Sequence, residues 1–176
     1  MTTSTGKAAA VGDGGLRLRE PENRLERRVV WYWAVHALLG WLAFAAAQTV
    51  WMLLRDDGPV EWHQAGLVLT AALGAAHVAV MPPWRYRVHR WETTPEAIYT
   101  QTGWFVEERR LAPVSRVQTV DSERGPLERL FKLTNVTATT ASAAGPIKIH
   151  GLDHATGQRL VADITAAAQA TRGDAT

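Results

Sequence analysis

Two long apolar stretches dominate the first half of the chain. Residues 29–54 and residues 62–81 contain no Asp, Glu, Lys or Arg. A helix needs about 20 residues to cross a hydrocarbon core of about 30 Å, so each stretch is long enough to span a membrane. Backbone groups inside lipid must bond within their own segment, which favours helices. The pattern therefore predicts a transmembrane hairpin over residues 24–83, with helices at about 29–54 and 62–81.

A cleavable signal peptide is the alternative for the first stretch, with Ala43–Ala45 as a small-residue cleavage site. However, the apolar residues continue as far as Leu54, beyond the 7–15 residues or so of a typical signal-peptide core. A second apolar stretch follows directly. These features favour a retained membrane anchor.

Arginine positions predict the orientation of the hairpin. The segment between the two stretches, residues 55–61, carries one Arg and three carboxylates, whereas arginines gather outside the hairpin. They are Arg17, Arg19, Arg24, Arg27 and Arg28 before it and Arg85, Arg87 and Arg90 after it. Basic residues near membrane spans stay on the cytoplasmic side. We therefore expect a multi-pass protein of the inner (plasma) membrane with both termini in the cytoplasm.

Small residues recur at four-residue spacing on the second helix, at Gly66, Thr70 and Gly74. Such spacing lets two helix backbones approach closely in lipid. The partner is either the first helix of the same chain or a second copy in a homodimer, and the sequence leaves both open.

Two histidines, His36 and His77, lie within the apolar stretches at similar depths from the cytoplasmic end. Ionisable residues inside a membrane raise a functional hypothesis. A pair of this kind can ligate haem iron axially, or it can form a neutral hydrogen bond with Trp33 or a backbone carbonyl. The second interpretation is favoured, and no cofactor is predicted.

Beyond Pro82 and Pro83, which are expected to end the second helix, the pattern changes to short alternating segments separated by Thr, Gly, Pro and Ser. This is typical of antiparallel strands. Ile98, Tyr99, Phe105 and Val106 are expected to supply a small core. The predicted strands are Trp84–Trp91, Ala97–Thr102, Trp104–Leu111, Arg116–Asp121, Val136–Thr140 and Ile147–His150.

Two helical segments accompany the strands. Residues 125–133 place Leu127, Leu130 and Phe131 on one helical face, either to cap the sheet or to contact a partner. A longer amphipathic helix is predicted over residues 154–170, with Asp153 as its N-cap. The fold class is therefore a two-helix hairpin followed by an α+β domain. Residues 84–171 would form a curled antiparallel sheet or partial barrel of six to seven strands, capped by the C-terminal helix. Residues 1–23 are predicted to be disordered, and residues 172–176 form a tail.

Four segments of this domain resemble the bacterial membrane-flanked pleckstrin-homology-like (PH) domain family, YdbS-like. They are Trp84–Val88, Tyr99–Trp104, Val114–Asp121 and Gly125–Phe131, and the stretch from Arg116 to Phe131 is the most specific. Family members often have Gly where this chain has Lys132. The resemblance implies a PH-like barrel with a C-terminal helix and supplies no catalytic residues.

The sequence contains none of the common catalytic motifs. P-loop, dinucleotide-binding, nucleophile-elbow and metalloprotease signatures are all absent. His150, Asp153 and His154 are close in sequence, but they straddle a strand end and a helix start, so no metal site is predicted. We expect a non-enzymatic protein.

Two binding functions fit these observations. The favoured one is a membrane-anchored interaction module that holds a membrane-protein partner, such as another PH-domain membrane protein, through Leu130 and Phe131. The alternative is binding of anionic lipid headgroups by a basic face composed of Arg85, Arg87, Arg90, Arg116 and Arg129. Nucleic acid is not expected, because the net charge is only +2 and glutamates interleave with the arginines.

Overall fold

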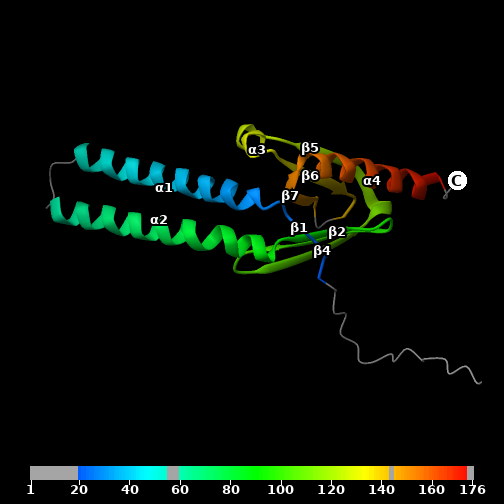
Figure 1. The fold of residues 1–176 in the computed structure, drawn as a ribbon, viewed down its shortest axis with the longest axis horizontal. Helices are drawn as coiled ribbons and strands as arrows, with labels where there is room; N and C mark the ends of the chain where they lie inside the picture. The colour runs from blue at the N-terminus through cyan, green and yellow to red at the C-terminus, as the bar shows by residue number, and fades with distance from the viewer. Residues whose placement is uncertain (1–19, 55–59, 143–144, 174–176) are drawn as a thin grey trace, which may run out of the picture.

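The computed structural model describes residues 20–54, 60–142 and 145–173. It shows a long helical hairpin joined end-on to a β-rich domain (Figure 1). The predicted disorder of residues 1–19, the loop at 55–59 and the last residues of the tail lie outside the described residues.

The hairpin consists of α1 (Arg28–Leu54) and α2 (Val60–Val88), both long and apolar enough to be candidate membrane spans. The small residues of α2 face α1 of the same chain. Thr70 Oγ1 donates to Gln48 Oε1 at 2.9 Å, and a Cβ on Gly74 would lie 3.1 Å from the ring of Trp41. A Cβ on Gly66 would meet the Gln48 amide at 3.0 Å. These contacts give the small residues a partner within the chain, and the homodimer remains a prediction.

Helix α2 does not end at the two prolines. It continues through Pro82 and Pro83 to Val88, so the predicted strand Trp84–Trp91 is wrong, and the strand itself, β2, spans Arg90–Thr93. Proline removes a helix donor and crowds the preceding turn, but packing against neighbouring helices compensates for this. Here the guanidinium of Arg85 lies 4.4 Å from the centre of the Trp33 ring, and this contact anchors the last turns of α2 on α1.

Seven antiparallel strands form two sheets. The first has the order β1 (Asn23–Arg24), β2, β3 (Ala97–Gly103) and β4 (Glu107–Pro113). The second has the order β5 (Val117–Glu123), β6 (Leu133–Thr140) and β7 (Ile147–Asp153). A short 3-10 helix, η1 (Val114–Arg116), joins them, and α3 (Pro126–Leu130) connects β5 to β6. Among the described residues no strand pairing closes one sheet onto the other, which confirms the predicted curled sheet or partial barrel.

The domain begins before the hairpin. Strand β1 pairs with β2, with Asn23 opposite Trp91 and Arg24 opposite Arg90. Leu25 and Val29 follow in the core at 6% and 1% exposure. Residues that the sequence placed in a disordered segment and in the hairpin thus complete the sheet. A strand of two residues has no alternation by which the sequence could have revealed it.

The core lies between the two sheets and α4 (His154–Gly173), which covers the second sheet (Figure 1). Leu160 and Ile164 of α4 are buried, and Asp153 Oδ1 accepts from the Thr156 N–H at 3.0 Å, which confirms the predicted cap. Ile98 is fully buried as expected.

Phe105 and Val106 are not in the core. They are 84% and 79% exposed, because Gly103 turns the chain at φ 148° and β4 begins only at Glu107. Residues 104–106 form the tip of the β3–β4 hairpin instead of the start of a strand.

Candidate functional site

Strand β4 is the most regular sheet edge in the part of the chain that the structure describes. It is the last strand of its sheet and pairs with β3 from Ala97↔Pro113 to Gly103↔Glu107 without a register shift. The outer strands of the other sheet, β5 and β7, both pair with β6 through irregular registers. Bulges protect an edge from further pairing, whereas a regular edge can accept another strand.

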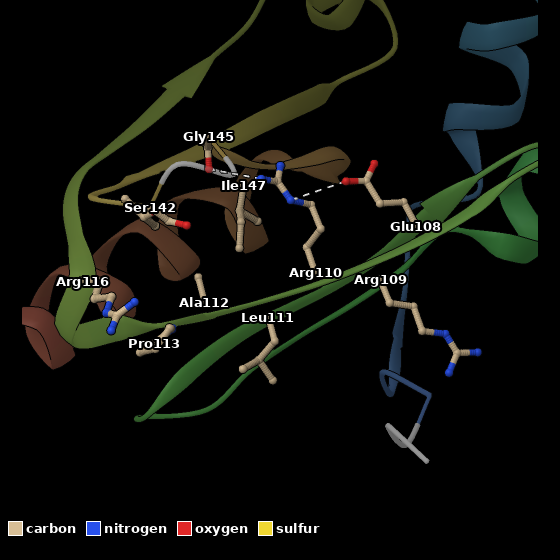
Figure 2. A pocket seen from close by; sticks show the side chains of 11 residues that line it. Glu108, Arg109, Arg110, Leu111, Ala112, Pro113, Arg116, Ser142, Gly145 and Ile147 are labelled. Atoms are coloured by element: carbon tan, nitrogen blue, oxygen red, sulfur yellow. Dashed lines mark hydrogen bonds and ion pairs between the residues drawn. The ribbon is translucent and has the colours of Figure 1, made fainter. Parts of the chain in front are cut away.

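An open groove of about 370 Å³ runs beside this edge (Figure 2). Arg110 of β4 reaches across it, where Nη1 donates to the Pro146 carbonyl at 2.8 Å and Nη2 donates to the Gly145 carbonyl at 3.2 Å. Arg110 also pairs with Glu108 at 3.5 Å. A single side chain therefore bridges the two sheets. The remaining lining includes Leu111, Ala112, Pro113, Arg116, Thr140, Ser142 and Ile147.

This arrangement is suited to capturing an extended peptide. Backbone groups of an edge strand supply affinity in strand addition, and pockets for alternate side chains supply specificity. Leu111 is 56% exposed beside the groove and offers an apolar contact. The charges of β4, from Glu107 to Arg110, discourage indiscriminate pairing, so a partner must match them.

A second cavity, of about 390 Å³, lies where the hairpin meets the domain. Its polar groups come from both parts of the molecule. Glu128 Oε1 of α3 accepts from the Tyr32 hydroxyl of α1 at 2.9 Å and from Asn135 Nδ2 of β6 at 3.2 Å. Arg85 lines the same cavity from α2, and His150 lines it from β7.

The junction cavity contains one carboxylate, that of Glu128, and one guanidinium, that of Arg85. Burial alone would raise the pKa of Glu128, but hydrogen bonds from its own backbone N–H, Tyr32 and Asn135 outweigh it, and the pKa lies below its usual value. Burial, followed by the charges of Arg85 and Lys148, lowers the pKa of His150. His150 is therefore neutral at pH 7.

The two histidines of the hairpin also line the junction cavity. Trp41 Nε1 donates to His77 Nδ1 at 2.9 Å, and His36 packs on the Tyr32 ring at 4.8 Å. His77 therefore forms a hydrogen bond, as predicted, but its partner is Trp41 and not Trp33. Among the described residues no group of three or more His, Asp or Glu is placed to hold a metal ion.

The five predicted arginine contacts have different surroundings. Arg85 lines the junction cavity and Arg116 lines the groove beside β4. Arg90 pairs with Glu20 at 3.4 Å, while Arg87 and Arg129 are exposed on α2 and α3.

The predicted Leu–Phe contact is also divided between two environments. Leu130 is 71% exposed, whereas Phe131 is partly buried and meets Tyr32 edge-to-face at 6.1 Å. Arg110 and Glu128 were not among the predicted site residues. Arg110 is one of four consecutive charged residues and Glu128 lies in a short helix. The sequence does not distinguish either residue from its neighbours, because Pro146 and Tyr32, which they bind, are distant along the chain.

The open two-sheet β-domain with its C-terminal helix, joined to two candidate membrane spans, has the architecture of a PH-like protein. The chain belongs to the family described as "Bacterial PH domain", whose profile matches residues 30–168. This confirms the resemblance.

A curated relative is "UPF0699 transmembrane protein YdbS" of Bacillus subtilis (strain 168). The two are 34% identical over 97 residues, which cover 55% of this chain and 60% of that protein. Neither description names a catalytic activity. No solved structure matches the chain.

Proposed function

We propose that this protein is a non-enzymatic, membrane-anchored interaction module that holds a protein partner at the inner face of the plasma membrane. The observation that supports it is the regular edge of β4 beside an open groove. An extended segment of the partner would add to β4 as a further antiparallel or parallel strand.

The hairpin restricts which partners can reach this edge. Helix α2 enters the sheet after a single residue, His89, so the groove stays at a fixed distance from the membrane. A partner segment close to the membrane surface meets this geometry best. The partner is therefore a membrane protein, such as another PH-domain membrane protein, that offers a cytoplasmic segment next to its own spans.

Site-specific photo-crosslinking in native membranes tests this function. A photoreactive amino acid at Leu111, on the edge, is expected to form a defined adduct with one membrane protein. The matched control is Gln118, which is exposed on the irregular edge strand β5. An adduct of equal yield from both positions, or none from Leu111, would contradict capture at β4.

Binding of an anionic lipid headgroup is a second candidate function, and the junction cavity favours it. The cavity holds the Arg85 guanidinium at the end of a candidate membrane span, where phosphate headgroups lie. The expectation is that the Arg85→Gln variant loses co-purifying anionic lipid in native mass spectrometry. Arg87→Gln, on the same helix but outside the cavity lining, should keep it.

Both tests require the full chain. Residues 20–29 contribute β1 and two core side chains, so a fragment that starts at Arg85 lacks part of its own core.

A further inference from the structure

The tip of the β3–β4 hairpin is an exposed apolar feature of the domain. Phe105 and Val106 are 84% and 79% exposed, and Trp104 beside them is 39% exposed. Soluble surfaces carry scattered apolar side chains, but three in succession on a protruding tip call for a partner.

The tip is fixed against α2. The Trp104 ring stacks on His77, with centroids 5.6 Å apart and planes inclined by 29°. Trp84 Nε1 donates to the Trp104 carbonyl at 3.1 Å. Figure 1 shows the β3–β4 hairpin extending along α2, away from the rest of the domain. The tip therefore lies beside the last turns of a candidate membrane span.

The contacts also give the depth of the tip. Arg85 is the first charged residue of α2 after Glu61, and interfacial tryptophans such as Trp84 mark the edge of the hydrocarbon. His77 lies seven residues before Trp84, which is about 10 Å further along the helix. A ring stacked on His77 is therefore below the headgroups.

The other side of the hairpin carries a matching feature. Helix α3 lies against α1, since Tyr32 bonds Glu128 and contacts Phe131. Leu130, at the end of α3, is 71% exposed. Figure 1 shows α3 and the β3–β4 hairpin on opposite sides of the helical pair, at the same end of the domain.

We propose that Trp104, Phe105 and Val106 insert among the lipid acyl chains of the inner leaflet alongside α2, with Leu130 as a second contact. The domain is then seated on the bilayer at two points besides its covalent connection to the hairpin. This inference rests on the membrane anchoring proposed above, but not on peptide capture at β4. The partner is the lipid itself, because the tip is continuous with the lipid-facing surface of α2.

Fluorescence quenching in proteoliposomes tests the insertion. The chain has no cysteine, so a single Cys with an environment-sensitive dye reports one position. The positions are Phe105→Cys at the tip, Glu96→Cys at the exposed β2–β3 turn, and Leu69→Cys at a 60% exposed site in α2. Phospholipids brominated in the acyl chain quench from the lipid, and iodide quenches from water.

Insertion predicts that the dye at position 105 is quenched by brominated lipid and is several-fold less sensitive to iodide than the dye at position 96. If position 105 behaves like position 96 while position 69 is quenched by lipid, the insertion is wrong and the anchoring stands. If position 69 is also not quenched by lipid, the anchoring itself is wrong. Protection of position 105 from both quenchers would mean that protein covers the tip, which also overturns the proposal. Val106→Cys provides a second labelled position at the tip. An unchanged urea midpoint for unfolding of each variant shows that the cysteine has not damaged the local structure.

Discussion

Acidification should loosen the joint between the hairpin and the domain through His89. This side chain is 4% exposed and follows the last residue of α2. Its Nδ1 lies 2.8 Å from the Arg85 carbonyl and its ring packs edge-on against Trp33 at 5.2 Å. The contacts assign a neutral ring that donates from Nδ1. A proton on Nε2 would place a second cation beside the Arg85 guanidinium.

The size of the effect follows from the shift in pKa. Burial outweighs the hydrogen bond to the Arg85 carbonyl and, together with the charges of Arg85 and His150, lowers the pKa of His89 from 6.5 to about 4. The unfolded chain therefore binds the proton more tightly, and stability falls as the pH drops from 6.5 toward 4. At pH 5 the difference amounts to about 2 kcal/mol, and it levels off near 3 kcal/mol below pH 4.

Urea unfolding of the full chain in mild detergent, at pH 8 and pH 5, measures this difference. With a slope of about 2 kcal/mol per molar urea, the midpoint should fall by about 1 M. The lowered pKa of His150 adds to the effect in the same direction. Glu128 and Asp153 also have lowered pKa values, but they lose their contribution only below about pH 4.

The matched variant is His89→Gln, which keeps a donor but does not titrate. Its midpoint should depend much less on pH than that of the parent, with a remainder from His150. Equal midpoints of the parent protein at pH 8 and pH 5, or an unchanged pH dependence in His89→Gln, would refute the reasoning.

Three substitutions test other contacts. Gly151→Ala should lower the unfolding free energy by about 2–4 kcal/mol, measured by urea denaturation, because φ is 69° and the new Cβ would lie 2.5 Å from Val29 of α1. Gly74→Leu should push against Trp41 and lower the thermal midpoint, while light scattering shows an unchanged mass; a halved mass would instead favour the homodimer. Arg110→Ala should cost about 1 kcal/mol in the same urea assay by releasing the bridge between the sheets, and no loss would show that the bridge is not needed.

Periodic patterns made the elements of this fold predictable. The apolar stretches gave the hairpin, alternation gave strands β3 to β7 within a few residues, and an acidic cap followed by an apolar stripe gave α4. These signals are local, so a sequence carries them without knowledge of the partner surfaces.

The remaining features depend on contacts between distant segments. Proline rules ended α2 too early because they do not include the packing of Arg85 on Trp33. The apolar tip at Phe105 was assigned to the core because its helix neighbour is not visible in the sequence. Arg110 became notable only once the structure placed it across the groove. The candidate site was therefore much less predictable than the fold.

The pairing of β1 with β2 connects membrane insertion to folding. About 65 residues, including both candidate spans, separate these two strands along the chain. The sheet can form only if the segments before α1 and after α2 emerge on the same side of the bilayer. A chain that inserted one helix alone would leave Leu25 and β2 on opposite sides, with an incomplete core exposed to degradation. On the proposed anchoring, completion of the domain would report, during biogenesis, that both helices have crossed.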